Sequence, residues 1–173
     1  DQCREGVFNV IITWAASGQY GFSYTQDDIL APCQSVKTEW KYACYYEFSQ
    51  KIKSSGGHDV VALWKIASSI PDPEHSLTVF KVAVANIVQS TILSGEHERE
   101  LMRCASLPES PALQCVTSII YGLFEHGSVQ KEYVLALKAC LLLEESPILA
   151  QRCYKAMMTK LPRFYDAATQ ARI

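Results

Sequence analysis

The cysteines are the residues of this sequence whose type and spacing could do chemistry. Six of the seven form three pairs with similar separations along the chain: eleven residues for Cys33 and Cys44, eleven for Cys104 and Cys115, and thirteen for Cys140 and Cys153. A disulfide requires its two Cα atoms to lie within about 6 Å, which a short helix–turn–helix of this length allows. The spacing therefore favours three local disulfides over free thiols buried in a core.

Other uses of cysteine need spacings that this chain lacks. A structural zinc site uses close pairs such as C-x-x-C with a matching second pair, and haem attachment uses C-x-x-C-H; neither pattern occurs. Persistent disulfides are typical of oxidising compartments. We therefore expect an extracytoplasmic protein, whether secreted, on a cell surface, periplasmic or lumenal.

The paired cysteines mark a longer repeat. The first cysteines of the pairs, at positions 33, 104 and 140, leave one interval about twice too long, and Ala67 fills it. The segment ASSIPDPEHSLT, from Ala67 to Thr78, aligns with CASLPESPALQC, from Cys104 to Cys115. This unit has therefore lost its cysteines, and the four reference positions recur every 34 to 37 residues.

Apolar residues recur in the same register. Three residues before the first-cysteine positions lie Leu30, Trp64, Leu101 and Leu137, and four residues after the second-cysteine positions lie Val7, Phe48, Val82, Ile119 and Met157. Spacings of three, four and eight are helical, and the period-two alternation of strands is rare. The sequence predicts an all-α fold, with residues 1–173 as a single repeat domain: a solenoid of antiparallel helix pairs with about 4.5 repeats of 34–41 residues.

Each repeat is predicted as one helix that ends near the first cysteine, a tight turn, and a second helix that begins near the second cysteine. The turns LPESP, IPDP and EESP contain proline, which ends the first helix and is tolerated at the start of the next. The second helix is predicted to end at SSGGHD, LSGEHE and FEHGSV, where a glycine can close it in the left-handed conformation. Each disulfide would join the two helices of one repeat.

This architecture resembles the tetratricopeptide-like superfamily, particularly its secreted members with one cysteine pair in each helical repeat. The resemblance extends from Cys3 to about Tyr165, although the consensus Trp, Gly and Tyr positions of tetratricopeptide repeats are not met. It implies a right-handed solenoid whose general role is binding. No individual functional residue carries over from it.

Cys3 is the unpaired cysteine. It occupies a second-cysteine position, so its partner is expected about eleven residues upstream, before residue 1. We therefore expect a mature product or a fragment that lacks the N-terminal half repeat and any targeting segment. An intermolecular disulfide to another subunit and a free thiol are the alternatives.

Aromatic residues concentrate near the N-terminus, where ten of the eighteen precede residue 50. The stretch SGQYGFSYTQDD is an insertion relative to the other repeats, and a loop of Tyr, Phe, Gly and Ser is typical of a recognition surface. The candidate partner-binding residues are Tyr20, Phe22, Tyr24, Trp40 and Tyr45. The alternative is that Tyr20, Phe22 and Tyr24 cover the exposed end of the first helix pair.

Three histidines share a place in the repeat. His58, His97 and His126 follow a second helix and would line one edge of the solenoid, near acidic residues. Adjacent repeats lie about 10 Å apart, which is wide for ligands of one metal ion, and a histidine after a helix is also favoured by the helix dipole. A metal- or cofactor-carrying protein that uses this edge is the second functional hypothesis.

Charge and motifs narrow the remaining functions. The net charge is −2 and basic runs are absent, so nucleic acid is not an expected partner. The longest apolar run, VFNVIITWAA, is half a membrane span, so no transmembrane segment is expected. G-x-S-x-G, H-E-x-x-H and phosphate-loop patterns are absent, which leaves an enzyme as the third hypothesis, with no catalytic residue assigned. The leading hypothesis is a binding or assembly module that contacts a protein partner or itself and requires no cofactor.

Overall fold

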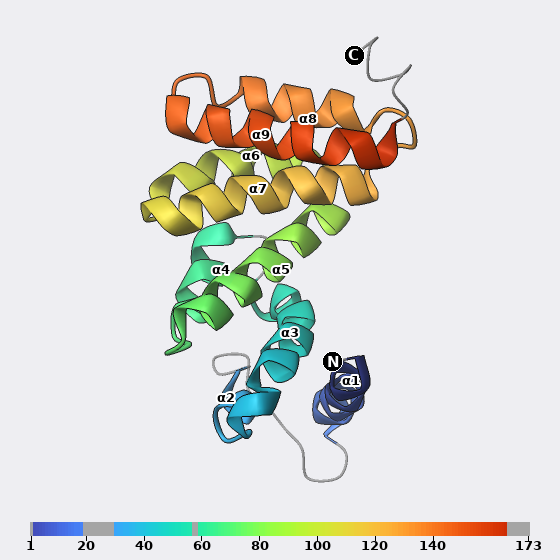
Figure 1. Cartoon of the computed structure of the whole chain (residues 1–173), viewed down its shortest axis with the longest axis vertical. Coiled ribbons are helices and arrows are strands. Elements are labelled where there is room, and N and C mark those ends of the chain that lie inside the picture. The colour runs from blue at the N-terminus through green and yellow to red at the C-terminus, as the bar shows by residue number, and fades with distance from the viewer. Residues whose placement is uncertain (1, 19–29, 57–58, 166–173) are drawn as a thin grey trace.

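The structure describes residues 2–18, 30–56 and 59–165. The regular secondary structure of these residues is helical, and they form no strand. The structure is a computed structural model (Figure 1). In chain order the helices are α1 Gln2–Ser17, α2 Ala31–Gln34, α3 Thr38–Gly56, α4 Val60–Ala67, α5 Pro73–Thr91, α6 Glu96–Arg103, the 3-10 helix η3 Cys104–Ser106, α7 Glu109–His126, α8 Glu132–Leu141 and α9 Pro147–Phe164. The predicted all-α fold is confirmed.

Long and short helices alternate along the chain. The long helices α1, α3, α5, α7 and α9 pack one on the next, and each of the last four also packs against the short helix that precedes it. Figure 1 shows this succession from α1 at one end of the molecule to α8 and α9 at the other. Each long helix therefore contacts mainly the long helices before and after it, together with the short helices next to it in the chain.

The long helices begin earlier than the sequence suggested. Cys44, Cys115 and Cys153 lie more than one turn inside α3, α7 and α9, not near their first residues. For α7 and α9, whose first turns contain Pro111 and Pro147, the reason is that proline suits the first turn of a helix, where its missing N–H is not needed. Pro73 and Pro147 are accordingly the first residues of α5 and α9.

Aspartate side chains fix the starts of two helices. Asp59 accepts hydrogen bonds from the backbone N–H groups of Val61 and Ala62 in the first turn of α4, and Asp72 caps α5 in the same way. These N–H groups have no partner inside their own helix, and an aspartate that accepts from them stabilises the helix by about 1 kcal/mol.

Glycine is used in two ways where long helices end. Gly95, between α5 and α6, has a φ of +76°, the left-handed conformation that the sequence predicts. Gly127, directly after α7, has a φ of −69° and a ψ of 172°, so the same prediction is wrong there. A Cβ atom at Gly127 would collide with the carbonyl oxygen of Leu123, so this position needs glycine for space.

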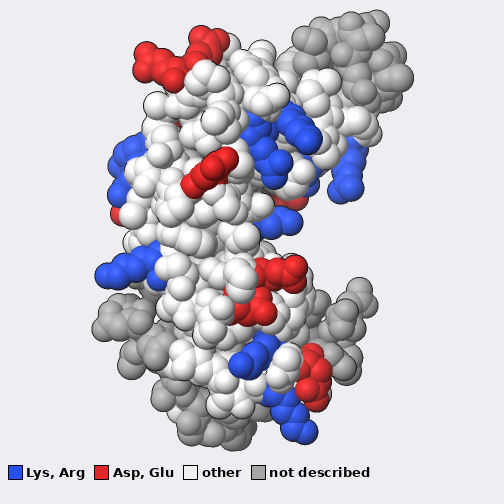
Figure 2. All heavy atoms as spheres, turned by 60° about the vertical axis from the view of Figure 1, so that its left-hand side comes forward, with Lys and Arg blue, Asp and Glu red and all other residues white. Residues whose placement is uncertain are grey.

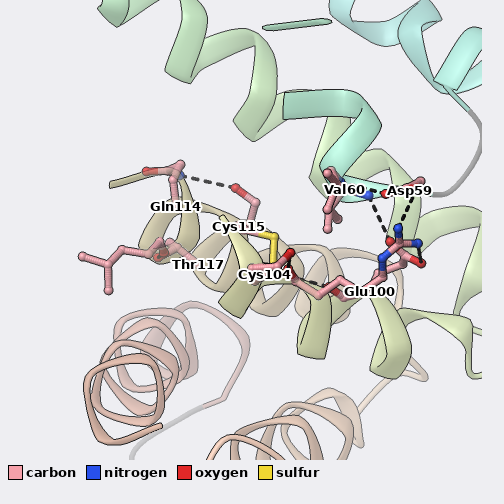
Figure 3. The surroundings of a disulfide bond; sticks show 12 residues. Asp59, Val60, Glu100, Cys104, Gln114, Cys115 and Thr117 are labelled. Atoms are coloured by element: carbon pink, nitrogen blue, oxygen red, sulfur yellow. Dashed lines mark hydrogen bonds and ion pairs between the residues drawn. A yellow bond between two sulfur atoms is a disulfide. The ribbon is translucent and has the colours of Figure 1, made fainter. Parts of the chain in front are cut away.

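Three disulfides join neighbouring helices. They are Cys33–Cys44, Cys104–Cys115 and Cys140–Cys153, with Cα–Cα distances of 5.7, 5.7 and 5.4 Å. The three predicted pairings are therefore confirmed. Each bridge links a short helix, or the turn that follows it, to the next long helix, as Figure 3 shows for Cys104–Cys115. Closing a loop of this size stabilises the fold by about 3 kcal/mol in the chain-entropy model.

The unit without cysteines is joined by apolar packing. Ala67, which takes the place of the first cysteine, is 1% exposed at the end of α4. Trp64 of α4 packs edge-on against Phe80 of α5, with ring centroids 5.3 Å apart. This aromatic pair joins the short helix to the long one where the other units have a disulfide.

The disulfides also indicate the kind of compartment in which the protein occurs. All six paired cysteines are buried, and disulfides of this kind are typical of an oxidising, extracytoplasmic compartment. None of the helices formed by the described residues is long and apolar enough to cross a bilayer.

A buried carboxylate connects two short helices (Figure 3). Glu100 of α6 is 0% exposed, and its Oε2 accepts a hydrogen bond from the backbone N–H of Val60 at 2.9 Å. Arg103 lies 3.5 Å from the other oxygen of Glu100 and donates to Asp59 at 2.7 Å. Partial burial alone would raise the pKa of Asp59, but its backbone N–H donors and Arg103 hold that pKa below its usual value. The charges therefore hold α4 and α6 in one arrangement.

Candidate binding groove

One stripe of side chains from each of three successive long helices lines a groove. On α3 the stripe is Tyr42, Tyr46 and Gln50, which recur every four positions and therefore share one face. Helices α5 and α7 contribute equivalent stripes, and the groove has a volume of about 440 Å³. This volume lies in the range of sites that bind ligands.

One side of the molecule is hollowed (Figure 2). Figure 2 shows this hollow on its right-hand side, with basic side chains gathered above it, toward the C-terminal helices, and acidic side chains below it. Helix α9 contributes basic residues and no acidic residue: Arg152, Lys155, Lys160 and Arg163. The surface above this hollow is therefore more basic than the surface below it.

Two tyrosines form the end of the groove on α3. The rings of Tyr42 and Tyr46 lie nearly parallel, at an interplanar angle of 16° with centroids 6.3 Å apart. Tyr42 is 47% exposed, and on its other side it approaches the ring of His75 from α5, at 6.1 Å between centroids. This end therefore presents flat aromatic surface that is held in place by neighbouring rings.

Amides and a cation occupy the middle of the groove. Asn86 of α5 donates a hydrogen bond from Nδ2 to Oε1 of Gln50 at 2.9 Å, which connects α3 to α5. Each side-chain amide has two donor hydrogens and a carbonyl acceptor, so this pair can also hydrogen bond to a bound chain. Lys81 is exposed beside the pair, and Val82 and Ala85 add apolar surface.

An ion pair fixes the end of the groove on α7. Lys160 of α9 is 8% exposed; its Nζ lies 2.9 Å from Oε1 of Glu125 and 4.3 Å from the centroid of the Tyr121 ring. A buried ammonium paired in this way holds both neighbours in one orientation. Tyr121, Glu125 and His126 all line the groove. The site thus offers aromatic surface, amides, a cation and a carboxylate, which are groups for noncovalent recognition.

The partner-binding residues predicted from the sequence fall in different places. Tyr20, Phe22 and Tyr24 lie outside the described residues. Trp40 is partly buried and packs edge-on against Phe8 of α1 at 6.0 Å. Tyr45 is 3% exposed and lies in the core, which differs from its predicted role at a surface.

The residues beside Tyr45 differ from it, because Tyr42 and Tyr46 line the groove. Burial, together with the charge of Asp72, raises the pKa of the Tyr45 hydroxyl, as expected for a core position. Tyr45 shares its helix face with Phe48 and Ile52, which are both 0% exposed. Tyr42 and Tyr46 point away from that face. The sequence contained a signal for this difference. Tyr45 lies three residues before Phe48 and seven before Ile52, which is the spacing of one buried helix face, whereas Tyr46 does not share that spacing.

The two predicted histidines that the structure describes lie in different surroundings. His97 is 3% exposed on α6, with its Nδ1 3.4 Å from the carbonyl oxygen of Thr91, whereas His126 ends α7 and lines the groove. His58 lies outside the described residues, as does the side chain of Cys3. Across the described ranges, no group of three or more His, Cys, Asp or Glu residues is placed to hold a metal ion. A metal site that includes His58 stays a prediction.

Comparisons with known proteins assign no family. No family model matches the chain, and neither a curated protein nor a solved structure matches it at a significant level. The function is therefore inferred from the groove and the helices that form it.

Proposed function

We propose that this protein is an extracytoplasmic helical-repeat module that binds a segment of a protein partner in the groove of α3, α5 and α7. In this proposal the helix pairs form a right-handed solenoid similar to the tetratricopeptide-like superfamily. The alternation of long and short helices and the order in which they pack support it. A secreted, cell-surface, periplasmic or lumenal location would suit its disulfides.

The observation that carries the proposal is the continuity of the groove across three repeats. Its lining changes from tyrosines on α3 to amides and Lys81 on α5, and then to Tyr121 and Glu125 on α7. Three helices about 9–10 Å apart span roughly 20 Å, the length of about six extended residues. A groove of this length and composition fits a short stretch of polypeptide.

The chemistry of the groove fits a polypeptide for two further reasons. A peptide backbone carries a donor and an acceptor at every residue, which the amides of Gln50 and Asn86 can complement. Tyrosine supplies large contact area at a low cost in conformational entropy, and it is enriched among residues that dominate binding energy. Tyr42 and Tyr121 stand at opposite ends of the groove, so they can anchor two side chains of the bound segment.

The experiment is a selection of displayed random peptides against the purified chain, with the disulfides intact. We expect enriched peptides whose binding shifts the backbone NMR signals of α3, α5 and α7. Asn86→Ala should weaken this binding about tenfold, because a buried hydrogen bond to the peptide is lost. Tyr42→Ala should weaken it by a similar factor.

The matched control is Gln89→Ala. Gln89 is an exposed amide on the same helix as Asn86 but does not line the groove, so its removal should leave peptide affinity unchanged. Failure to enrich any peptide, or enriched peptides that shift signals elsewhere and bind equally well to Asn86→Ala, would contradict the proposal.

A further inference from the structure

Helix α8 buries small residues along one face and packs Tyr133 and Leu135 partly against the core, but it leaves three of its large apolar residues exposed. Its buried residues include Ala136, Ala139 and Cys140, which are 0%, 1% and 0% exposed. Its exposed residues include Val134, Leu137 and Leu141, which are 39%, 39% and 49% exposed. A helix that packs only on its own chain places its larger apolar residues inward. The outer face of α8 therefore carries apolar side chains that remain exposed.

The three exposed residues form one stripe. Val134, Leu137 and Leu141 are separated by three and then four residues, so they lie on the same face of α8. This is the spacing of the apolar seam between two paired helices. We call these three residues the α8 stripe.

The position at the centre of the stripe has equivalents in other helix pairs of the molecule, and two of these equivalents are buried. Leu137 stands three residues before a first-cysteine position, as do Leu30 and Leu101. Leu30 and Leu101 are 3% and 0% exposed, whereas Leu137 is 39% exposed. The same position is therefore buried in two other repeats and open on α8.

We propose that the α8 stripe binds the α8 stripe of a second copy of this chain, with the two helices antiparallel across a two-fold axis. Val134 of each copy would face Leu141 of the other, with Leu137 near the axis. A two-fold interface requires a self-complementary patch, and an antiparallel apolar seam has this property.

Charge at the two ends of the stripe supports this arrangement. Lys131 precedes α8 and Glu144 follows it, and both are exposed. The register that pairs Val134 with Leu141 also places Lys131 opposite Glu144 of the second copy, at both ends of the seam. Lys138 flanks the stripe, where its aliphatic stem can lie along the seam while its ammonium group remains in water.

The geometry predicts a reversible dimer. Helix α8 is about 15 Å long, so the pair buries less surface than a stable complex of standard size. We expect a dissociation constant on the order of tens of micromolar. Helix α8 does not contribute to the groove, so the dimer would be independent of the proposed function and would carry two grooves.

Sedimentation equilibrium of the whole chain from about 5 to 500 μM, which brackets the expected dissociation constant, tests the proposal. All samples carry Cys3→Ser, so that a disulfide between copies cannot produce a dimer. The mass should rise from 19.4 kDa toward twice this value with concentration. Lys131→Glu and Glu144→Lys should each weaken self-association about tenfold, because each places like charges at both ends of the seam. An equimolar mixture of the two variants should restore association, because the mixed pair regains both opposite-charge contacts.

Leu137→Glu should abolish the dimer, and Val61→Glu is its matched control. Val61 is a valine of α4 that is 38% exposed, so it tests the cost of an exposed apolar-to-glutamate change away from the stripe. Circular dichroism should show the same helix content for all variants. A monomer mass at the highest concentration, equal weakening by Leu137→Glu and Val61→Glu, or no restoration in the mixture would each overturn the proposal.

Discussion

The carboxylate of Glu100 accepts a hydrogen bond from the backbone N–H of Val60, the first residue of α4, at 2.9 Å, and both residues are completely buried. The acceptor comes from α6, forty residues further along the chain. Arg99 and Arg103 approach the other oxygen of Glu100 at 3.2 and 3.5 Å from the partly exposed side of the helix. The contacts of one buried side chain thus fix the start of α4 against α6.

Replacement of Glu100 should destabilise the fold, and the loss should be larger when the buried N–H of Val60 is left without an acceptor. Glu100→Ala leaves the N–H of Val60 buried without its acceptor and opens a cavity, so we expect a loss of about 2–4 kcal/mol in the free energy of unfolding. Glu100→Gln keeps an acceptor oxygen and the volume, so the loss should be about half as large. Urea unfolding followed by circular dichroism measures both.

Glu98→Ala is the control on the same helix. Glu98 is half-buried and lies outside the contact with Val60, so its replacement should change the free energy of unfolding by less than about 0.5 kcal/mol. Equal losses for Glu98→Ala and Glu100→Ala would show that the buried contact does not hold α4 and α6 together.

Two glycines inside long helices should respond in opposite directions to alanine. A Cβ atom at Gly122 of α7 would lie 2.8 Å from Cβ of Val88 and 2.9 Å from the carbonyl oxygen of Ala85, whereas a Cβ atom at Gly6 of α1 meets nothing within 4 Å. Gly122→Ala should therefore push α7 away from α5 and cost about 1–2 kcal/mol, even after the gain in helix propensity. Gly6→Ala should gain about 0.5–1 kcal/mol.

Thermal and urea unfolding of the two alanine variants, measured side by side, checks this contrast. The pair controls for helix propensity, because both changes add the same methyl group to a long helix. Stabilisation by both substitutions would mean that α5 and α7 do not approach each other closely at Gly122.

The helix pairs could be predicted from the sequence because their signal is periodic. Leu30 and Leu101 repeat at one offset from the cysteines and are both buried, so the register that predicts the disulfides also predicts part of the core. The first residues of the long helices were harder to predict from the sequence. In the sequence, a proline that begins a helix cannot be distinguished from a proline that follows the end of the preceding helix. Pro73 and Pro147 are of the first kind, because they begin α5 and α9.

The groove and the contact between the short helices could not be predicted, because they depend on tertiary packing. The spacing of Tyr45 to Phe48 and Ile52 separates it from Tyr46 on the helix, but it does not reveal that Tyr46 faces side chains of α5 and α7 across a groove. Glu100 is fully buried although α6 is a strongly polar helix, because its side chain accepts a hydrogen bond from a backbone N–H of α4. Local sequence carries no information about such a partner.

The alignment of the repeats predicts where a fourth disulfide can be engineered. Ala67 and Thr78 occupy the positions that hold Cys104 and Cys115 in the alignment of the repeats. The double variant Ala67→Cys with Thr78→Cys should therefore oxidise to a local bridge and stabilise the protein by up to about 3 kcal/mol. Non-reducing peptide mapping identifies the bridge, and urea unfolding with and without reductant measures its effect.

An out-of-register pair is the control for this bridge. Ser69→Cys with Thr78→Cys moves one thiol to an exposed position two residues past Ala67, where a geometry within about 6 Å between Cα atoms is not expected. A bridge in the Ser69 variant but not in the Ala67 variant would show that the repeat alignment is misplaced in this unit.

Tyr165 and Glu132 form a buried pair that closes the end of α9 on the start of α8. The Tyr165 hydroxyl donates a hydrogen bond to the Glu132 carboxylate, and each residue is 6% exposed. Burial, followed by the hydrogen bond to Glu132, raises the pKa of Tyr165 from 10.0 to about 12. Because the pKa in the folded state is the higher one, the stabilisation is fully present below about pH 10 and is lost as the pH rises from 10 toward 12.

Tyr165→Phe should therefore have an effect that depends on pH. Near pH 8 it should lower the free energy of unfolding by about 1.5–3 kcal/mol, because a buried carboxylate loses its donor. At about pH 11 the gap to the wild type should narrow, because the wild-type tyrosine is then penalised for staying protonated. Guanidinium unfolding at both pH values measures the gap, and Tyr133→Phe, which alters a neighbouring ring 5.5 Å away, is the matched control. A gap of the same size at both pH values would mean that the Tyr165 hydroxyl titrates as it does in the unfolded chain.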